Sequence, residues 1–256
     1  MLIKFNRIAV ALAITDTCRS SSRSTIKHLN RQLQGFLFDL DGTLVESENI
    51  HYESYKLTLL EHSPHFNNGK PISKEYYDRI AFGGTDKIIV PKIFPQFSTT
   101  EIQRFIEKKD EIFIGLSASV KKIPGVDNFL DWADDVGMRS LVVTNCNRVD
   151  AECILKEVNL ERLIDNIVIA DECEYHKPHP APYLKALKLL NLNPHQALAF
   201  EDSNTGIQSA LSAGLDTIGV SSSLTSEDLQ KLGVVHVVSD YNDEKLKALI
   251  ESRLSS

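Results

Sequence analysis

The sequence predicts an α/β protein: a parallel sheet with helices on both faces and an all-helical insert after the first strand. Short apolar runs alternate along the chain with stretches whose apolar residues recur about every 3.6 positions. Such strand–helix alternation favours a parallel sheet that is covered on both sides. The alternation stops between residues 46 and 118, where the patterns are helical only.

Strands are expected where short apolar runs are bounded by turns or by helical patterns. These runs cover residues 35–38, 140–143, 167–170, 197–200 and 217–220, with residues 234–238 as an added edge strand. Helices are expected between them at residues 126–136, 150–158, 181–190 and 205–213, with residues 244–254 as a closing helix.

The insert, residues 46–118, contains helical patterns at residues 48–60, 73–80, 86–93 and 100–116. Lys122-Ile123-Pro124-Gly125 marks the return to the core. Because the insert directly follows the first strand, it should lie over the carboxyl end of that strand, where a lid belongs. Residues 34–45 and 119–256 would then form the core domain.

Residues 1–33 are expected to form an N-terminal extension outside the fold. Residues 1–34 contain six basic side chains and one acid, and residues 18–25 are rich in Arg and Ser. This composition resembles an organellar transit peptide, and a disordered tail fits it equally well. The expected location is therefore cytoplasmic, or an organelle matrix (mitochondrion or plastid) if the segment is a transit peptide.

Charge, hydropathy and cysteine spacing exclude several classes of partner. The net charge of −7 argues against a general nucleic-acid binder. No apolar run approaches the length that crosses a bilayer, so no membrane partner is expected. The four cysteines show neither paired metal spacing nor a disulfide framework, which indicates reduced thiols. We expect a monomer.

The most informative motif is Asp39-Leu40-Asp41-Gly42-Thr43, directly after the first apolar run. Open α/β sheets bind their ligands at the carboxyl ends of the strands. Asp39 and Asp41 would repel each other there unless a cation lay between them, and carboxylates suit Mg²⁺. An acidic turn is the alternative for this motif taken alone.

Three later segments repeat the pattern of polar residues after a strand. Thr144 and Asn145 can hydrogen-bond phosphate oxygens, although they would also serve as helix caps. Lys177 lies between prolines on a stiff turn and can balance phosphate charge, unless it is a solvated surface lysine. Glu201 and Asp202 can complete a hard-cation site or cap the next helix.

Together these four motifs, in this order, resemble those of the haloacid dehalogenase-like hydrolase superfamily. The resemblance covers about residues 34–252 and implies a Rossmann-like core, and the helical insert looks like the C1 cap of that superfamily. Residues 66–72, 173–187 and 200–203 further resemble plant-type, broad-range sugar-phosphate phosphatases in the β-phosphoglucomutase-like branch.

The resemblance implies a role for each motif residue. Asp39 corresponds to the nucleophile that forms an aspartyl-phosphate, and Asp41 to the general acid that protonates the leaving alkoxide. Thr144, Asn145 and Lys177 would hold the transferring phosphoryl group. Mg²⁺ would be held by the Asp39 carboxylate, the Asp41 backbone carbonyl and the Asp202 carboxylate, with Glu201 nearby or acting through water.

An acid at position 41 favours turnover of a phosphate ester over the dehalogenase and ion-pump branches. Mutase members use cap residues to hold a bisphosphate, and His51, Gly84 and Lys87 are the matching substrate-binding candidates here. No Lys precedes the glycine pair at residues 83–84, so the cap should hold a second phosphate less tightly. We therefore expect a Mg²⁺-dependent phosphatase of small sugar or polyol phosphates, with a β-phosphoglucomutase-type phosphotransferase as the alternative.

Overall fold

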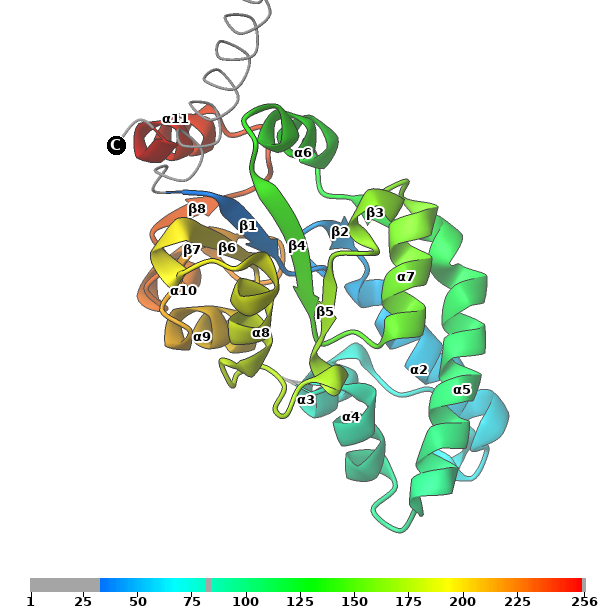
Figure 1. Cartoon of the computed structure of the whole chain (residues 1–256). Coiled ribbons are helices and arrows are strands. Elements are labelled where there is room, and N and C mark those ends of the chain that lie inside the picture. Colours follow the sequence, from blue (N-terminus) through cyan, green and yellow to red (C-terminus); the bar gives the residue numbers. More distant parts are fainter. Residues whose placement is uncertain (1–32, 82–83, 255–256) are drawn as a thin grey trace, which may run out of the picture.

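The computed structural model describes residues 33–254 apart from residues 82 and 83, and its centre is a six-stranded parallel sheet (Figure 1). The strand order β5-β4-β1-β6-β7-β8 places β1 in the interior, with β4 and β6 as its neighbours. The predicted α/β fold is confirmed. The strands are β1 (Gly35–Phe38), β4 (Arg139–Thr144), β5 (Ile167–Ile169), β6 (Ala197–Glu201), β7 (Asp216–Val220) and β8 (His236–Val238).

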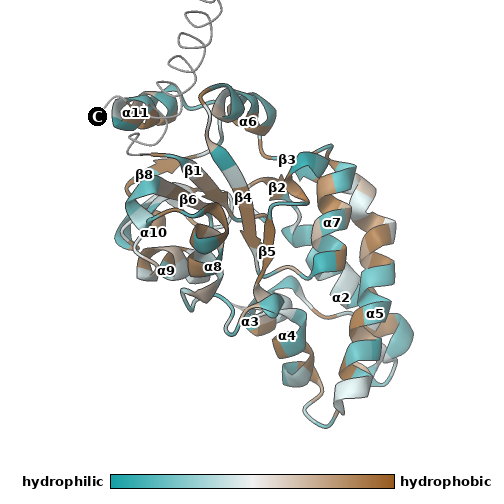
Figure 2. Ribbon diagram, viewed as in Figure 1, coloured by the Kyte–Doolittle hydropathy of each residue, from teal (hydrophilic) through white to brown (hydrophobic). Residues whose placement is uncertain are grey.

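Helices cover both faces of the sheet. One face packs against α6 (Val126–Asp135), α7 (Arg148–Glu157) and α11 (Glu244–Leu254). The other packs against α8 (Ala181–Leu190) and α9 (Asn204–Ser212), with α10 (Ser226–Lys231) beside β7 and β8. All four residues of β1 are buried, so this strand is a continuous apolar run rather than an alternating one. Figure 2 shows the strands as the hydrophobic centre between amphipathic helices.

The insert after β1 is helical, as expected. It contains α2 (Glu48–His62), α3 (Lys74–Ala81), α4 (Asp86–Ile93) and α5 (Thr99–Leu116), which enclose a hydrophobic core of their own. Figure 1 shows α3 and α4 beyond the arrowheads of β4 and β5. The insert therefore lies at the carboxyl edge of the sheet. Short 3-10 helices complete the chain: η1 (Phe66–Gly69), η2 (Ser117–Ser119), η3 (Glu161–Leu163), η4 (Ala170–Glu172) and η5 (Pro194–Gln196).

A short antiparallel pair joins the insert to the sheet, and the sequence did not predict it. Strands β2 (Val45–Glu46) and β3 (Lys121–Lys122) have two residues each. Segments this short, with charged residues in three of the four positions, contain no apolar run to detect. The pair brings the two ends of the insert together.

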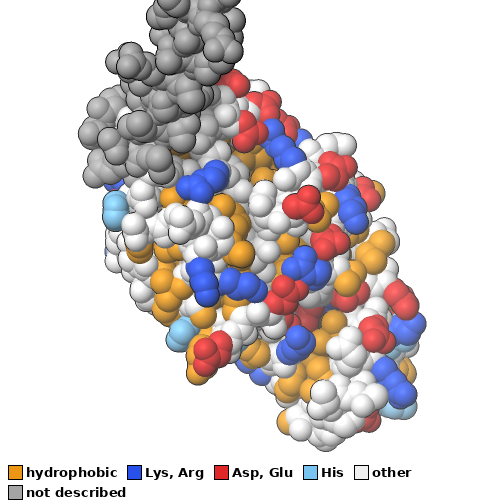
Figure 3. All heavy atoms as spheres, in the orientation of Figure 1, with side chains coloured by type: hydrophobic (Ala, Val, Ile, Leu, Met, Phe, Trp, Pro, Cys, Tyr) orange, Lys and Arg blue, Asp and Glu red, His pale blue; other side chains and the backbone are white. Residues whose placement is uncertain are grey.

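The face drawn in Figure 3 carries interspersed acidic and basic side chains rather than a continuous field of one sign. In the part of the chain that the structure describes, no helix is long and apolar enough to cross a membrane. The expected extension at residues 1–33 lies almost wholly outside the described residues, which begin at Leu33, so its proposed targeting role stays a prediction.

Candidate active site

The site begins where three neighbouring strands end. Asp39 directly follows β1, while Thr144 and Glu201 are the last residues of β4 and β6. Phe38 of β1 is in register with Val142 of β4 and Phe200 of β6. Because the three strands are parallel, their carboxyl ends deliver these side chains to one edge of the sheet.

Lys177 lies at the centre of this edge, where 2% of its surface is exposed. Its Nζ donates hydrogen bonds to Asp39 Oδ1 (2.7 Å), to the carbonyl of Val143 (2.8 Å) and to Glu201 Oε1. Burial alone would lower the pKa of Lys177, but the two carboxylates outweigh this and raise it. Lys177 is thus a buried cation, and its interpretation as a solvated surface lysine is wrong.

Asp39, Glu201 and Asp202 each offer a carboxylate oxygen within 4.8 Å of the others. Burial raises the pKa of Asp39 well above its usual range; Lys177 lowers it in part, and the charges of Glu201 and Asp202 raise it further. Burial and then the Glu201 charge raise the pKa of Asp202 to about 8. One lysine therefore leaves negative charge uncompensated, and an oxygen-rich cluster of this kind fits Mg²⁺.

Two glycines leave room for the carboxylates of Asp202 and Glu201. Gly42 has a φ of +75°, and a Cβ added there would lie 2.0 Å from Asp202 Oδ2. A Cβ added at Gly206 of α9 would lie 1.9 Å from Glu201 Oε2. A real Cβ does not approach an atom this closely, so both positions require glycine. The Gly in the Asp39–Thr43 motif thus serves both the turn and the packing around Asp202.

Asp41 points to a different set of partners. Its Oδ1 accepts a hydrogen bond from Ser47 Oγ and lies 3.0 Å from His51 Nε2. Burial raises the pKa of Asp41, but the contacts with His51 and Ser47 outweigh it and leave the pKa lowered. Burial lowers the pKa of His51, and Asp41 reverses this and raises it. The two side chains therefore form an ion pair at the base of α2.

Thr144 and Asn145 lie at the end of β4, and Asn145 contacts the turn that carries Lys177. Thr144 is fully buried and its Oγ1 accepts a hydrogen bond from the backbone N–H of Cys146 (2.9 Å). Asn145 Oδ1 accepts one from the backbone N–H of Lys177 (3.3 Å). The two residues thus order the turn after β4 and the turn that carries Lys177. Their amide and hydroxyl groups remain at the sheet edge.

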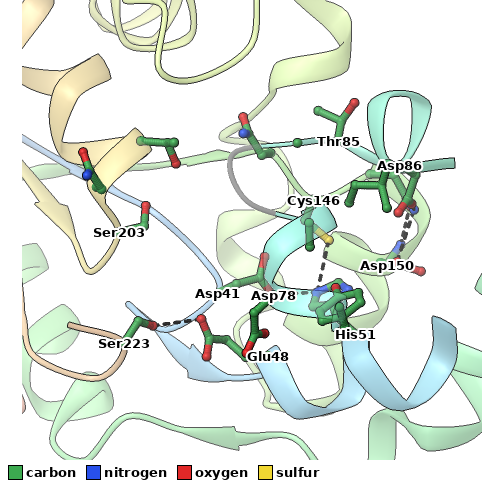
Figure 4. Close-up of a pocket in the computed structure, with 18 of the residues that line it drawn as sticks. Asp41, Glu48, His51, Asp78, Thr85, Asp86, Cys146, Asp150, Ser203 and Ser223 are labelled. Atoms are coloured by element: carbon green, nitrogen blue, oxygen red, sulfur yellow. Dashed lines mark hydrogen bonds and ion pairs between the residues drawn. The ribbon is translucent and has the colours of Figure 1, made fainter. Parts of the chain in front are cut away.

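A cavity of about 590 Å³ lies between this edge and the insert (Figure 4). Asp41, Asn145 and Ser203 line it on the core side. On the insert side its wall comes from α2, α3 and the start of α4: Glu48, His51, Lys74, Tyr77, Asp78, Ala81, Gly84, Thr85, Asp86 and Ile89. A small molecule held here would have Asp41 on one side and the insert on the other.

The three candidate substrate-binding residues of the insert have different positions. His51 and Gly84 both line the cavity. Lys87 is not among the residues that line the cavity. Its side chain is 60% exposed, and its Nζ pairs with Asp171 Oδ2 at 3.1 Å. The described structure therefore gives no support to Lys87 as a substrate contact.

Sequence reasoning missed a buried polar cluster at the far end of the cavity. Lys109 of α5 is 1% exposed and contacts Asp86 (2.9 Å), Asp110 (3.0 Å) and Asp150. Asn147 Nδ2 donates to the same three carboxylates, at 2.8, 3.0 and 3.2 Å. The signal was that Lys109 occupies a core position of its helix, three or four residues from the buried Phe105, Ile106 and Phe113.

The residues that hold Glu201 and Asp202 were also missed. Tyr183 OH donates to Glu201 Oε1 (2.7 Å), and Ser203 Oγ to Glu201 Oε2 (3.2 Å). Ser223 Oγ donates to Asp202 Oδ2. Tyr183 occupies an ordinary apolar position of α8, and Ser223 lies in a polar loop. Neither carries a pattern that the sequence alone would single out.

Comparison with known proteins agrees with this fold. The haloacid dehalogenase-like hydrolase family matches residues 36–220. The phosphorylated carbohydrates phosphatase of Thermotoga maritima is 27% identical, over 86% of this chain and 91% of its own length. The fructose-1-phosphate phosphatase YqaB of Escherichia coli is 27% identical, over 73% and 95%.

Among solved structures, a mutant of CbbY from Rhodobacter sphaeroides, in complex with xylulose-(1,5)bisphosphate, superimposes with a TM-score of 0.74. It is 23% identical and the match covers 82% of this chain and 96% of that one, which shows the shared fold. The finer resemblance to plant-type phosphatases stays a prediction. Because the family match spans most of the chain, from β1 to β7, this protein belongs to the haloacid dehalogenase-like hydrolases.

Proposed function

We propose that this protein is a Mg²⁺-dependent phosphatase that hydrolyses small sugar or polyol phosphates through an aspartyl-phosphate. One observation carries the proposal: buried Lys177 contacts Asp39 beside a cluster of further carboxylates, at the edge of the sheet that faces the cavity. The names of the two relatives, phosphatases of phosphorylated carbohydrates and of fructose 1-phosphate, support the substrate class.

In this proposal, residues 46–118 act as a cap over a core formed by residues 34–45 and 119–256. The phosphoryl group of the substrate meets the sheet edge, and the rest of the substrate occupies the cavity. Lys177, Thr144 and Asn145 hold the phosphoryl oxygens, where preorganised electrostatic stabilisation is the main contribution to rate. We expect the protein to act as a monomer.

Asp39 is the proposed nucleophile. Its carboxylate attacks phosphorus, the bond to the leaving oxygen breaks, and water then releases phosphate from Asp39. The carboxylates of Asp39 and Asp202 would hold Mg²⁺, with the Asp41 backbone carbonyl as a further ligand. Glu201 already accepts hydrogen bonds from Lys177, Tyr183 and Ser203, so its role would be near the metal or through water. When bound, Mg²⁺ would reduce the repulsion between the acid and the phosphate dianion.

Asp41 is the proposed general acid, and it needs a proton when the alkoxide leaves. In the free protein its pKa is lowered, so it begins as the carboxylate paired with His51. An incoming phosphate dianion raises the pKa of a nearby carboxyl group by like-charge repulsion. His51, whose own pKa is raised, can pass its Nε2 proton to Asp41 over 3.0 Å.

A phosphate-release screen over a panel of sugar and polyol phosphates, in Mg²⁺ and in EDTA, tests the proposal. We expect release in Mg²⁺, little in EDTA, and near-complete loss in the Asp39→Asn variant with the fold retained. Incubation with β-glucose 1-phosphate and a bisphosphate primer separates the mutase alternative. Isomer formation without free phosphate would reject a phosphatase.

A further inference from the structure

The walls of the cavity carry more acidic than basic side chains. Beyond Asp41, four carboxylates line it: Glu48, Asp78, Asp86 and Asp150. The basic side chains among the lining residues are His51 and Lys74. Figure 4 shows Asp86 and Asp150 near one another, on the far side of Cys146 and His51 from Ser223.

Both basic side chains already have a carboxylate partner. His51 pairs with Asp41 at 3.0 Å, and Lys74 pairs with Asp78 one helical turn along α3. Residues 82 and 83 of the insert, which the structure does not describe, are Phe and Gly and add no charge. Among the described residues that line the cavity, no cation is left for a second phosphate.

Several lining residues instead hold oxygen atoms that lack a hydrogen-bond partner. Thr85 Oγ1, Asp150 Oδ1 and Asn204 Oδ1 are buried and have none among the described residues. Thr85 is 3% exposed and Asp150 is fully buried. Buried polar atoms are normally paired. The Thr85 hydroxyl can donate or accept, but Asp150 Oδ1 and Asn204 Oδ1 can only accept. Sugar hydroxyl groups can donate hydrogen bonds to these two oxygens, whereas a phosphate dianion has none to donate.

The far wall of the cavity is formed by Thr85, Asp86 and Asp150, and Asp86 keeps its negative charge there. It accepts hydrogen bonds from Tyr55 (2.7 Å), Lys109 (2.9 Å) and Asn147 (2.8 Å). Burial raises the pKa of Asp86, but Lys109 and these hydrogen bonds lower it to about 2. Lys109 is shared with two more carboxylates, Asp110 and Asp150, so it does not offset the negative charge of this end.

We propose that this far wall selects the neutral polyol part of a monophosphate and excludes a second phosphate group. The inference rests on the proposed phosphatase function and specifies its substrate class. This expected preference for monophosphates distinguishes the chain from CbbY, whose mutant structure contains xylulose-(1,5)bisphosphate. It also disfavours mutase chemistry, because a bisphosphate intermediate would face the same carboxylates.

The test compares kcat/KM within matched pairs: fructose 1-phosphate with fructose 1,6-bisphosphate, glucose 1-phosphate with glucose 1,6-bisphosphate, and xylulose 5-phosphate with xylulose 1,5-bisphosphate. Like charges placed together across a binding surface are strongly disfavoured, so we expect the best monophosphate to exceed its bisphosphate by at least roughly tenfold. A bisphosphate that equals or exceeds every monophosphate overturns the inference.

A further substrate, p-nitrophenyl phosphate, has no polyol part and therefore measures phosphate-ester hydrolysis at the sheet edge alone. Hydrolysis of this ester alone would leave the phosphatase proposal standing and overturn the selection of polyols. Failure to hydrolyse any of these esters would remove the proposed function, and the inference with it.

Two variants change acidic side chains that line the cavity, one in the far wall and one on α3. Asp86→Asn removes a buried charge. Asp78→Asn removes the carboxylate partner of Lys74, and because the Asp78 side chain is 53% exposed we expect the fold to tolerate the change. We expect each to raise the ratio of bisphosphate to monophosphate kcat/KM about tenfold. Glu111→Gln removes the same charge from an exposed position of α5, where Glu111 pairs with Lys108, and is the matched control. If both variants shift this ratio no more than the control does, the inference fails.

Discussion

Replacing Lys177 with methionine should destabilise the protein strongly, because it leaves two carboxylates buried without their cation. Lys177 is 2% exposed, and its Nζ contacts Asp39 at 2.7 Å as well as Glu201, which is fully buried. Breaking a buried ion pair by removing one partner costs about 3–5 kcal/mol. Because this cost is smaller than a typical unfolding free energy of about 5–15 kcal/mol, the variant should still fold at 25 °C.

A second substitution separates the charge effect from lost packing. In Lys177→Met with Glu201→Gln, one stranded carboxylate becomes a neutral amide, whose oxygen can still accept from Tyr183 and whose nitrogen can donate to the Ser203 hydroxyl. Removing that uncompensated charge should make the free energy of unfolding of the double variant about 1–3 kcal/mol higher than that of Lys177→Met. Lys108→Met, at an exposed pair on α5, should change stability by less than about 1 kcal/mol.

Urea unfolding followed by circular dichroism measures all three variants. The double variant should unfold at a higher urea concentration than Lys177→Met, with the slope of the transition unchanged. If Lys177→Met unfolds within about 1 kcal/mol of the wild type, Lys177 does not balance these buried charges. The electrostatic description of the sheet edge would then be wrong.

Catalysis, packing, acid sensitivity and metal binding can each be tested with one substitution. Asp39→Asn should lose turnover by at least about 10³-fold with an unchanged circular dichroism spectrum, and turnover close to wild type would mean that the nucleophile is misassigned. Gly206→Ala should lower the free energy of unfolding in urea by more than about 2 kcal/mol, since its Cβ would lie 1.9 Å from a buried carboxylate oxygen. Gly115→Ala, with open space around it in α5, should instead raise the free energy of unfolding by about 0.5–1 kcal/mol. Equal effects of the two changes would contradict the close packing at Gly206. The pKa of Asp86 is lowered from 3.8 to about 2 in the folded protein, so its charge stabilises the fold fully above pH 4 and loses this contribution as the pH falls towards 2. Asp86→Asn should therefore reduce the loss of stability between pH 4 and pH 2 by about 2 kcal/mol. A stability–pH curve of unchanged shape would refute this. Mg²⁺ at 100 times its Kd should add about 2.7 kcal/mol to stability, and Asp202→Asn should reduce that gain at the same Mg²⁺ concentration; a gain that this substitution leaves intact would place the metal elsewhere.

The core sheet was predictable because its strands are short, buried and apolar, and each is followed by a helix. Asp39, Thr144, Lys177 and Glu201 were predictable for a related reason: parallel strands bring residues distant in sequence to one edge. The family match and the observed sheet bear out the predicted family and fold. What each residue does remains a proposal.

Other features depend on tertiary contacts that leave little trace in the sequence. The strands β2 and β3 are too short to show a period, and α10, whose cap is Thr225, buries little more than Leu229. Lys87 was favoured by its place in the resemblance, but its position beside Asp171 follows from how α4 packs. The pairing of His51 with Asp41 likewise depends on the angle at which α2 leaves the core.

A crystal structure with Mg²⁺ and beryllium fluoride tests the central claim most directly, because trifluoroberyllate on a carboxylate mimics an aspartyl-phosphate. We predict beryllium bonded to Asp39, its fluorines contacted by Lys177 and Thr144, and Mg²⁺ between Asp39 and Asp202. Trifluoroberyllate on another side chain, or Mg²⁺ bound away from these carboxylates, would contradict the claim.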